Sequence, residues 1–228
     1  MKTDVPIRAI IFDLDDTLYL ERDYAFSGFR AVAHTYSHLL GNPQNSLNTM
    51  RALFDSPHRH RVFNQLLQDI SVEHDLQLIQ KMVATFRKHT PDIQLLPDAS
   101  SALSRLAATY KLGLITDGPA QVQHAKIDAL KLATRIDKII VTGELEPGAE
   151  KPSPRSFEMI AGALEVHHGE CVYVADNPAK DFIAPNALGW KTVRIIRPLG
   201  VYKNVCPAKD GEAKHTISSL DELDRLLK

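Results

Sequence analysis

Three aspartates follow a short apolar run near the start of the chain, in the segment IIFDLDDTLY at residues 10–19. Asp13 and Asp15 lie two positions apart, so an extended backbone would place their carboxylates roughly on the same side. Two convergent carboxylates repel each other, and a divalent cation such as Mg²⁺, which prefers hard oxygen ligands, relieves that repulsion. A surface turn or a helix cap would also explain these residues, since Asp is common at both.

Further polar residues follow apolar runs later in the chain. They are Thr116, Asp117 and Gly118, then Lys151, then Asp176, Asn177 and Asp181. Ligands of open α/β sheets bind outside the carboxyl ends of the strands, so we expect these groups to meet the first aspartates at one edge of a sheet. Each has an ordinary explanation by itself, as a helix cap, a turn or a solvated lysine. Together they outline a site for phosphate and metal.

Short apolar runs alternate with segments of helical spacing over the C-terminal two thirds of the chain. The expected strands are residues 7–12, 112–116, 136–143, 171–175 and 191–196. The expected helices between them are residues 99–110, 122–129 and 157–164, the second with a stripe of Val122, Ala125 and Ala129. Parallel neighbours need a crossover, so the alternation predicts an α/β fold with a parallel sheet and helices on both faces. Ser219 and Glu222 form a capping box that predicts a last helix.

Residues 20–93 interrupt this alternation, because they contain no strand-like run. Four apolar stripes at helical spacing begin there at Phe26, Leu47, Val62 and Leu76. We therefore expect an inserted all-helical domain at residues 20–93 and a core domain made of residues 1–19 and 94–228.

Composition and charge exclude several classes of protein. The 228 residues include 27 Lys and Arg against 28 Asp and Glu, so no excess of positive charge favours nucleic acid or an anionic membrane surface. The N-terminus lacks the pattern of a secretory signal, and no run approaches the roughly 18 apolar residues of a membrane span. We expect a cytoplasmic protein without nucleic-acid or membrane partners, whose oligomeric state the sequence leaves open. Two cysteines, Cys171 and Cys206, indicate no disulfide framework.

Four motifs in a fixed order point to a known family. FDLDDTLY, ITDG, KPSP and VADNPAKD, with a helical insert between the first two, resemble the haloacid dehalogenase superfamily of phosphohydrolases. The resemblance covers nearly the whole chain. It implies a Rossmann-like core with a helical cap domain inserted after the first motif.

The resemblance also implies roles for individual residues. Asp13 would attack phosphorus and become an aspartyl phosphate. Asp15 would protonate the leaving oxygen and then activate a water molecule. Mg²⁺ would be held by the carboxylates of Asp13 and Asp176 and by the backbone carbonyl of Asp15. The other implied roles are phosphate binding by Thr116, Asp117 and Gly118, charge neutralisation by Lys151, support of the metal by Asn177 or Asp181, and bracing of the loop by Thr17.

Two positions depart from the commonest pattern of the family. Asp117 stands where many relatives have Asn, and Ala175 stands where many have Gly. A carboxylate at position 117 would repel an anionic substrate unless its side chain points away or finds a cation. These departures bear on substrate preference more than on the class of reaction.

We expect Mg²⁺-dependent hydrolysis of a small phosphomonoester, a phosphorylated metabolite such as a sugar phosphate or a nucleotide. A phosphomutase shares every motif named here and is the alternative. A non-enzymatic phosphoacceptor module is less favoured, because no candidate Asp follows IIVTG and the helical insert would be unexplained. A dehalogenase needs no acid to release a halide, so Asp15 argues against that activity.

Two segments are less informative. DSPHRHR at residues 55–61 is expected to be a loop in which Arg59 and Arg61 select the substrate by binding a second anionic or polyhydroxy group. A solvated basic loop or a helix start is the alternative, and it is the favoured interpretation because exposed charge is the default for such residues. Residues 197–215 are expected to be a long irregular stretch, and no motif in it indicates a role.

Overall fold

The computed structural model describes residues 5–227 of the chain. The chain divides into two compact units, one made of residues 1–22 and 94–228 and the other of residues 23–93. The boundaries expected from the sequence were 19/20 and 93/94. That residues 23–93 act as a cap stays a prediction.

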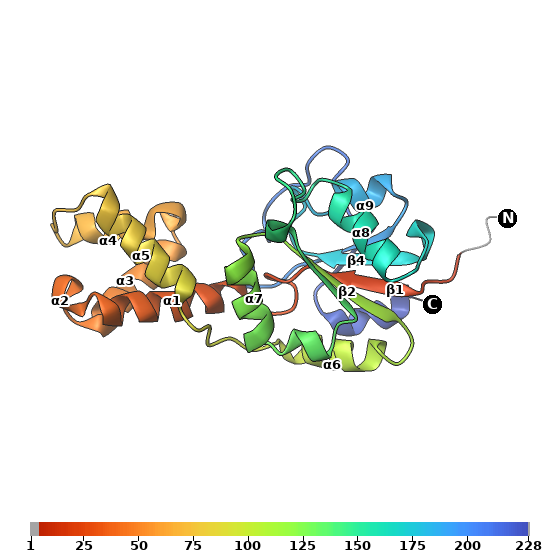
Figure 1. The fold of residues 1–228 in the computed structure, drawn as a ribbon, viewed down its shortest axis with the longest axis horizontal. Helices are drawn as coiled ribbons and strands as arrows, with labels where there is room; N and C mark the ends of the chain where they lie inside the picture. The colour runs from red at the N-terminus through yellow and green to blue at the C-terminus, as the bar shows by residue number, and fades with distance from the viewer. Residues whose placement is uncertain (1–4, 228) are drawn as a thin grey trace. The chain divides into compact units, whose positions relative to one another are not determined.

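A six-stranded parallel sheet lies at the centre of the first unit, in the part of the chain that the structure describes (Figure 1). Its strands are β1 (Ala9–Phe12), β2 (Lys111–Thr116), β3 (Lys138–Val141), β4 (Cys171–Ala175), β5 (Lys191–Ile195) and β6 (His215–Ile217). Their order across the sheet is β3-β2-β1-β4-β5-β6, and all neighbours pair in parallel. The arrangement confirms the predicted α/β, Rossmann-like fold. The three-residue strand β6 was not predicted, because a segment so short carries no readable alternation.

Helices cover both faces of this sheet. They are α6 (Pro97–Leu106), α7 (Ala120–Ala129), α8 (Arg155–Ala163), α9 (Ile183–Ala187) and α10 (Leu223–Leu226). In Figure 1, α8 and α9 lie over one face of the sheet, and α6 and the last helix lie over the other. The predicted capping box of Ser219 and Glu222 is present at the turn that leads into α10.

The central strand β1 ends directly before Asp13, in the middle of the carboxyl edge of the sheet. Every residue of β1 is fully buried, since β2 and β4 flank it and helices cover it. On the side of α8, the ring of Phe157 packs edge-on against Tyr173 of β4, with 4.9 Å between the centroids, and against Trp190 at 5.5 Å. Asp13 therefore follows the end of a rigid, closely packed strand.

The second unit is helical. Its helices are α1 (Glu21–Thr35), which begins in the first unit, α2 (Ser37–Leu40), α3 (Pro43–Phe54), α4 (Val62–Asp69) and α5 (Leu76–Lys88). The rings of Phe29, Phe63 and Phe86 meet at centroid distances of 5.5 to 6.0 Å inside this unit. Met50 and Met82 are fully buried beside them, so the unit has a core of its own. Within residues 5–227, no helix is long and apolar enough to cross a membrane.

The irregular segment after β5 fastens the loop that follows β1. Arg197 is 5% exposed and donates hydrogen bonds to the backbone carbonyl of Thr17 at 2.7 Å and to Asp98 of α6 at 2.6 Å. Burial alone would raise the pKa of the Asp98 carboxyl, but hydrogen bonds from Arg197 and the Leu220 N–H lower it. The backbone N–H of Val201 donates to Asp16 at 2.7 Å. The segment after β5 thus binds both Asp16 and Thr17, in the loop that follows β1.

The Arg197–Asp98 pair yields a stability prediction. Arg197→Met should lower the free energy of unfolding by about 3 kcal/mol, because it leaves a poorly exposed carboxylate without its cation. The double variant Arg197→Met/Asp98→Asn should lose less, since Asn keeps an oxygen for the Leu220 N–H without the charge. Urea unfolding of the three proteins measures the difference.

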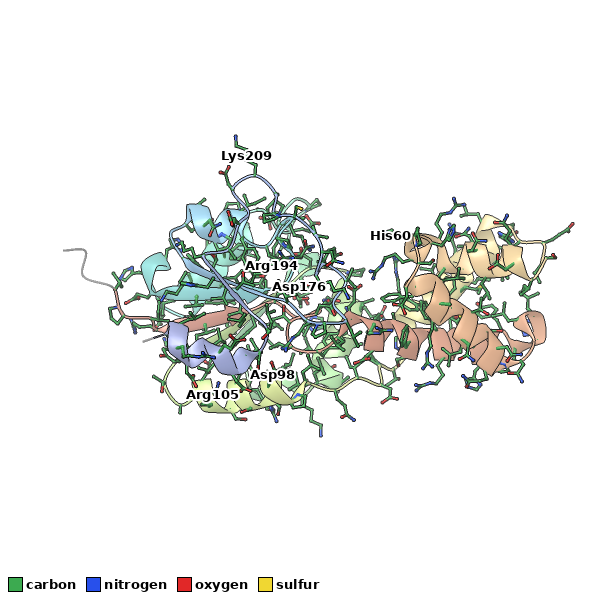
Figure 2. The ribbon with its side chains drawn as sticks, turned by 180° about the vertical axis from the view of Figure 1, so that it is seen from behind. His60, Asp98, Arg105, Asp176, Arg194 and Lys209 are labelled. Carbon is green, nitrogen blue, oxygen red and sulfur yellow. The ribbon has the colours of Figure 1, made fainter. Side chains whose placement is uncertain are left out.

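Arg105→Met is the matched control. Arg105 also lies on α6 (Figure 2) and pairs with Asp224 at 2.9 Å, but it is more exposed. Its loss should cost about 0–1 kcal/mol. A double variant that is less stable than Arg197→Met alone would contradict the assignment of an unbalanced charge.

Candidate active site

Three buried carboxylates meet at the carboxyl ends of β1 and β4. Asp13 directly follows β1, Asp176 directly follows β4, and Asp181 lies in the turn before α9. One oxygen of each lies within 4.8 Å of one oxygen of the other two. Figure 2 shows Asp176 in the unit that contains the sheet. Since adjacent parallel strands end at the same edge, the fold brings together aspartates that are more than 160 residues apart.

The ammonium group of Lys151 lies among these carboxylates. Its Nζ is 2.5 Å from Asp13 Oδ1 and 2.8 Å from Asp181 Oδ1, and the Lys151 side chain is 1% exposed. It also donates to the hydroxyl of Tyr173 at 3.1 Å. Sequence reasoning missed Tyr173, because an aromatic residue in an apolar strand is usually only part of the core.

Burial and like charges shift the protonation of this cluster. Burial raises the pKa of Asp13 to about 7, although the nearby Lys151 opposes the shift. Burial, together with the charges of Asp13 and Asp181, raises the pKa of Asp176 well above its ordinary value. Burial alone would lower the pKa of Lys151, but the same two neighbours raise it well above the usual range. One ammonium therefore faces more negative charge than it can neutralise.

The cluster has the chemistry of a site for a hard divalent cation. All of its potential ligand atoms are carboxylate oxygens, which suit Mg²⁺. Oδ2 of Asp176 is buried and accepts no hydrogen bond, and Asp176 forms no ion pair with any residue in the range 5–227. Asp181 Oδ2 accepts the backbone N–H of Asn177 at 2.9 Å, which fixes the turn behind the cluster. The residues present fit the metal that the sequence motifs imply.

Asp15 has a separate set of partners, two from α7 and one from the loop after β1. Lys126 Nζ lies 2.8 Å and 3.0 Å from its two oxygens, and Gln123 donates to Oδ2 at 3.2 Å. The Tyr19 hydroxyl donates to Oδ1. Burial alone would raise the pKa of Asp15, but Lys126 and the hydrogen bonds from Lys126, Tyr19 and Gln123 lower it. These partners favour the ionised form of Asp15.

Lys126 and Gln123 were not predicted from the sequence. The stripe assigned to α7 was Val122, Ala125 and Ala129, but the buried residues of the helix are Val122, Gln123, Lys126 and Ile127. That part of the prediction is wrong, because it counted apolar residues alone. Two long polar side chains at i and i+3 between apolar positions were the available signal.

The expected extended geometry through the aspartates is also wrong. β1 ends at Phe12, and Asp16 has a φ of 52°, so the backbone turns within the motif. Asp16 Oδ1 accepts the N–H of Glu21, the first residue of α1, at 2.9 Å. The ordinary explanation as a helix-terminal acceptor therefore applies to Asp16, whereas Asp13 and Asp15 bind different lysines.

The Thr116–Gly118 segment begins at the last residue of β2 and packs tightly against the turn after β3. The Thr116 hydroxyl accepts a hydrogen bond from Gln123. Gly118 has a φ of 132°, a conformation that only glycine adopts readily. A Cβ on Gly143 would lie 2.1 Å from the carbonyl oxygen of Gly118, so both positions require glycine.

The carboxylate of Asp117 forms an ion pair with a lysine. Lys180 Nζ lies 2.5 Å from Asp117 Oδ2, while Thr142 Oγ1 donates to Oδ1 at 2.9 Å. Ala175, the other departure from the family pattern, is fully buried in the core beside α8. Neither departure leaves an unbalanced charge.

Thr17 reaches its neighbours through the backbone. Its carbonyl accepts the hydrogen bond from Arg197, whereas its buried hydroxyl has no partner among the described residues. In the helical unit, Arg59–Arg61 forms a 3-10 turn and not an open loop. The Arg59 guanidinium lies 4.3 Å from the centre of the Phe54 ring, and Arg61 is exposed.

Comparisons with known proteins show similarity over most of the chain. A family model described as haloacid dehalogenase-like hydrolase matches residues 10–195. The chain is 30% identical to a glyceraldehyde 3-phosphate phosphatase of Methanopyrus kandleri over 90% of each chain. It is 28% identical to the N-acylneuraminate-9-phosphatase of Homo sapiens over 97% of this chain and 94% of the other. Among solved structures, YfnB from Bacillus subtilis bound to magnesium shares the fold, with a TM-score of 0.71, 19% identity, and 98% and 100% of the two chains covered.

The close approach at Gly143 can be tested by adding one methyl group. Gly143→Ala should lower the free energy of unfolding by about 2 kcal/mol or more, because the new Cβ meets backbone that cannot move without the Thr116–Gly118 segment. Gly162→Ala is the control, since a Cβ there on α8 meets no atom within 4 Å. It should stabilise the helix by about 0.5–1 kcal/mol. Equal denaturation midpoints for the two variants would show that the contact between Gly143 and the Gly118 carbonyl does not restrict the residue at position 143.

Proposed function

The chain belongs to the haloacid dehalogenase-like hydrolase family, and we propose that it is a magnesium-dependent phosphatase of small phosphomonoesters. The observation that supports this most strongly is the buried Asp13 carboxylate 2.5 Å from Lys151, within a cluster that also contains Asp176 and Asp181. A carboxylate held in this way can act as a nucleophile while the adjacent ammonium stabilises the charge that develops on phosphorus.

In the first half-reaction, an oxygen of Asp13 attacks phosphorus and forms a P–O bond. The bond from phosphorus to the leaving oxygen breaks, and that oxygen takes a proton from Asp15. Thr116, the backbone N–H groups of Asp117 and Gly118, and Lys151 bind the phosphoryl oxygens. Bound Mg²⁺ would shield the carboxylates from those oxygens, held by Asp13, Asp176 and the carbonyl of Asp15 with Asp181 and Asn177 close by.

In the second half-reaction, water attacks the aspartyl phosphate. The bond between phosphorus and Asp13 breaks, inorganic phosphate leaves, and Asp15 takes the proton of the attacking water. The hydrogen bonds from Lys126 and Tyr19 to Asp15 favour its ionised form, which is the form that this step needs. The proton taken from water leaves the Asp15 carboxyl protonated, which is the form that the first half-reaction of the next cycle needs.

We propose a sugar phosphate or a related polyol phosphate as the substrate. Glyceraldehyde 3-phosphate and N-acylneuraminate 9-phosphate, after which two of the similar enzymes are named, both carry the phosphate on a primary carbon of a polar molecule. Those names also favour hydrolysis over a mutase reaction. Residues 23–93 would act as the cap that selects the leaving group, with Arg59 and Arg61 as candidate contacts. The location we propose is the cytoplasm.

The nucleophile is tested by Asp13→Asn. The amide is a poor nucleophile and a weak metal ligand, so turnover of any phosphomonoester should fall below about one thousandth of the wild-type rate. Asp128→Asn, an exposed change on α7, should keep full activity. Phosphate release by both variants in the presence of Mg²⁺ measures this. Residual turnover above that limit in a folded Asp13→Asn protein would refute the assignment.

The acid role of Asp15 is tested by the leaving group. Asp15→Asn should slow the first step with alkyl phosphates, whose leaving oxygen needs a proton, by about 10²–10⁴-fold. The same variant should form the intermediate almost normally from p-nitrophenyl phosphate, because nitrophenolate leaves without protonation. A single-turnover burst of nitrophenolate measures the first step separately from hydrolysis. An equal loss of the first step with both classes of substrate would rule out proton donation by Asp15.

A further inference from the structure

Asp117 joins three loops of the site through one carboxylate. Its Oδ1 accepts hydrogen bonds from the Thr142 hydroxyl, after β3, at 2.9 Å and from the backbone N–H of Lys151 at 3.3 Å. Its Oδ2 accepts from Lys180, in the turn after β4, at 2.5 Å. Asp117 itself follows β2. The side chain therefore connects the ends of β2, β3 and β4.

The Asp117 carboxylate carries a full negative charge in this position. Burial alone would raise its pKa, but the charges of Lys151 and Lys180 lower it. Its side chain is 14% exposed, so solvent screens that charge weakly. The carboxylate also belongs to the segment whose backbone N–H groups are proposed to bind the phosphoryl oxygens. An unbalanced charge here would oppose the binding of a phosphate dianion.

Lys151 stabilises this charge from a distance but forms no ion pair with it. Its ammonium contacts Asp13 and Asp181 at 2.5 Å and 2.8 Å, and only its backbone N–H reaches Asp117. Lys180, in contrast, forms its ion pair with Asp117. Two positions that lie 63 residues apart thus form an ion pair of zero net charge beside the carboxylate cluster.

We propose that Asp117 and Lys180 act as one neutral pair that sets the affinity of the site for the phosphoryl group. Lys180 is a positioning residue that cancels the charge of Asp117, and Asp117 in turn holds the loops of Thr142 and Lys151. The inference rests on the proposed phosphatase function, because the affected event is the binding of a phosphoryl dianion next to Thr116. Removing the charge of Lys180 and removing the charge of Asp117 should then shift phosphate affinity in opposite directions.

Three variants test the pair. Lys180→Met leaves the Asp117 charge unbalanced and should raise the inhibition constant of inorganic phosphate, and KM, about tenfold. Asp117→Asn keeps an oxygen for Thr142 and the Lys151 N–H, leaves Lys180 unbalanced, and should lower the inhibition constant. The double variant should return it to within about threefold of the wild-type value, because the two charges disappear together. Lys209→Met, on an exposed loop (Figure 2), is the control and should change nothing.

A merely structural pair would behave differently. Each single variant would then weaken phosphate binding and lower the melting temperature, and the double variant would be at least as impaired as either. That result would overturn the proposal. Calorimetric titration of each protein with inorganic phosphate and Mg²⁺ gives the affinity without turnover. If the wild type bound phosphate but hydrolysed no phosphomonoester, the phosphatase proposal would fail while the charge pair would still be measured.

Discussion

Two buried carboxylates, Asp13 and Asp181, share the single ammonium group of Lys151, and Asp176 lies beside them with one oxygen unpaired. Burying like charges at this density is unfavourable unless further positive charge is supplied. The pKa of Asp13, raised to about 7, reflects that cost. The charges of the site are therefore complementary to a divalent cation, and the surrounding loops keep the carboxylates together against their repulsion.

The loops resist this repulsion because each is fastened to another part of the core unit. Arg197 holds the carbonyl of Thr17, the N–H of Asn177 holds Asp181, and Gly143 packs directly on the carbonyl of Gly118. Lysines arranged around the site separate its negative charges: Lys126 binds Asp15 and Lys180 binds Asp117. Each carboxylate consequently keeps its own partners and orientation, which the proposed mechanism requires.

The sequence was sufficient to predict the parallel fold and the positions of Asp13, Thr116 and Asp176 at strand ends, because buried parallel strands form distinct apolar runs and their ends share one edge. It was not sufficient for Lys126, Tyr173 and Arg197. Their partners lie far away in the chain: Lys126 binds a residue 111 positions earlier and Arg197 one 180 positions earlier. A polar residue on a helix normally faces solvent, so only the folded chain reveals that α7 turns Lys126 and Gln123 inward.

The central claim is that Asp13 forms a covalent bond with the phosphoryl group. Borohydride reduces an acyl phosphate to an alcohol, so an aspartyl phosphate becomes homoserine, which peptide mass spectrometry identifies. Wild-type protein quenched during turnover with Mg²⁺ and a phosphomonoester is predicted to contain homoserine at position 13, and protein without substrate is predicted to contain none. Homoserine at Asp15 or Asp117 instead, or turnover without homoserine at any aspartate, would contradict the account.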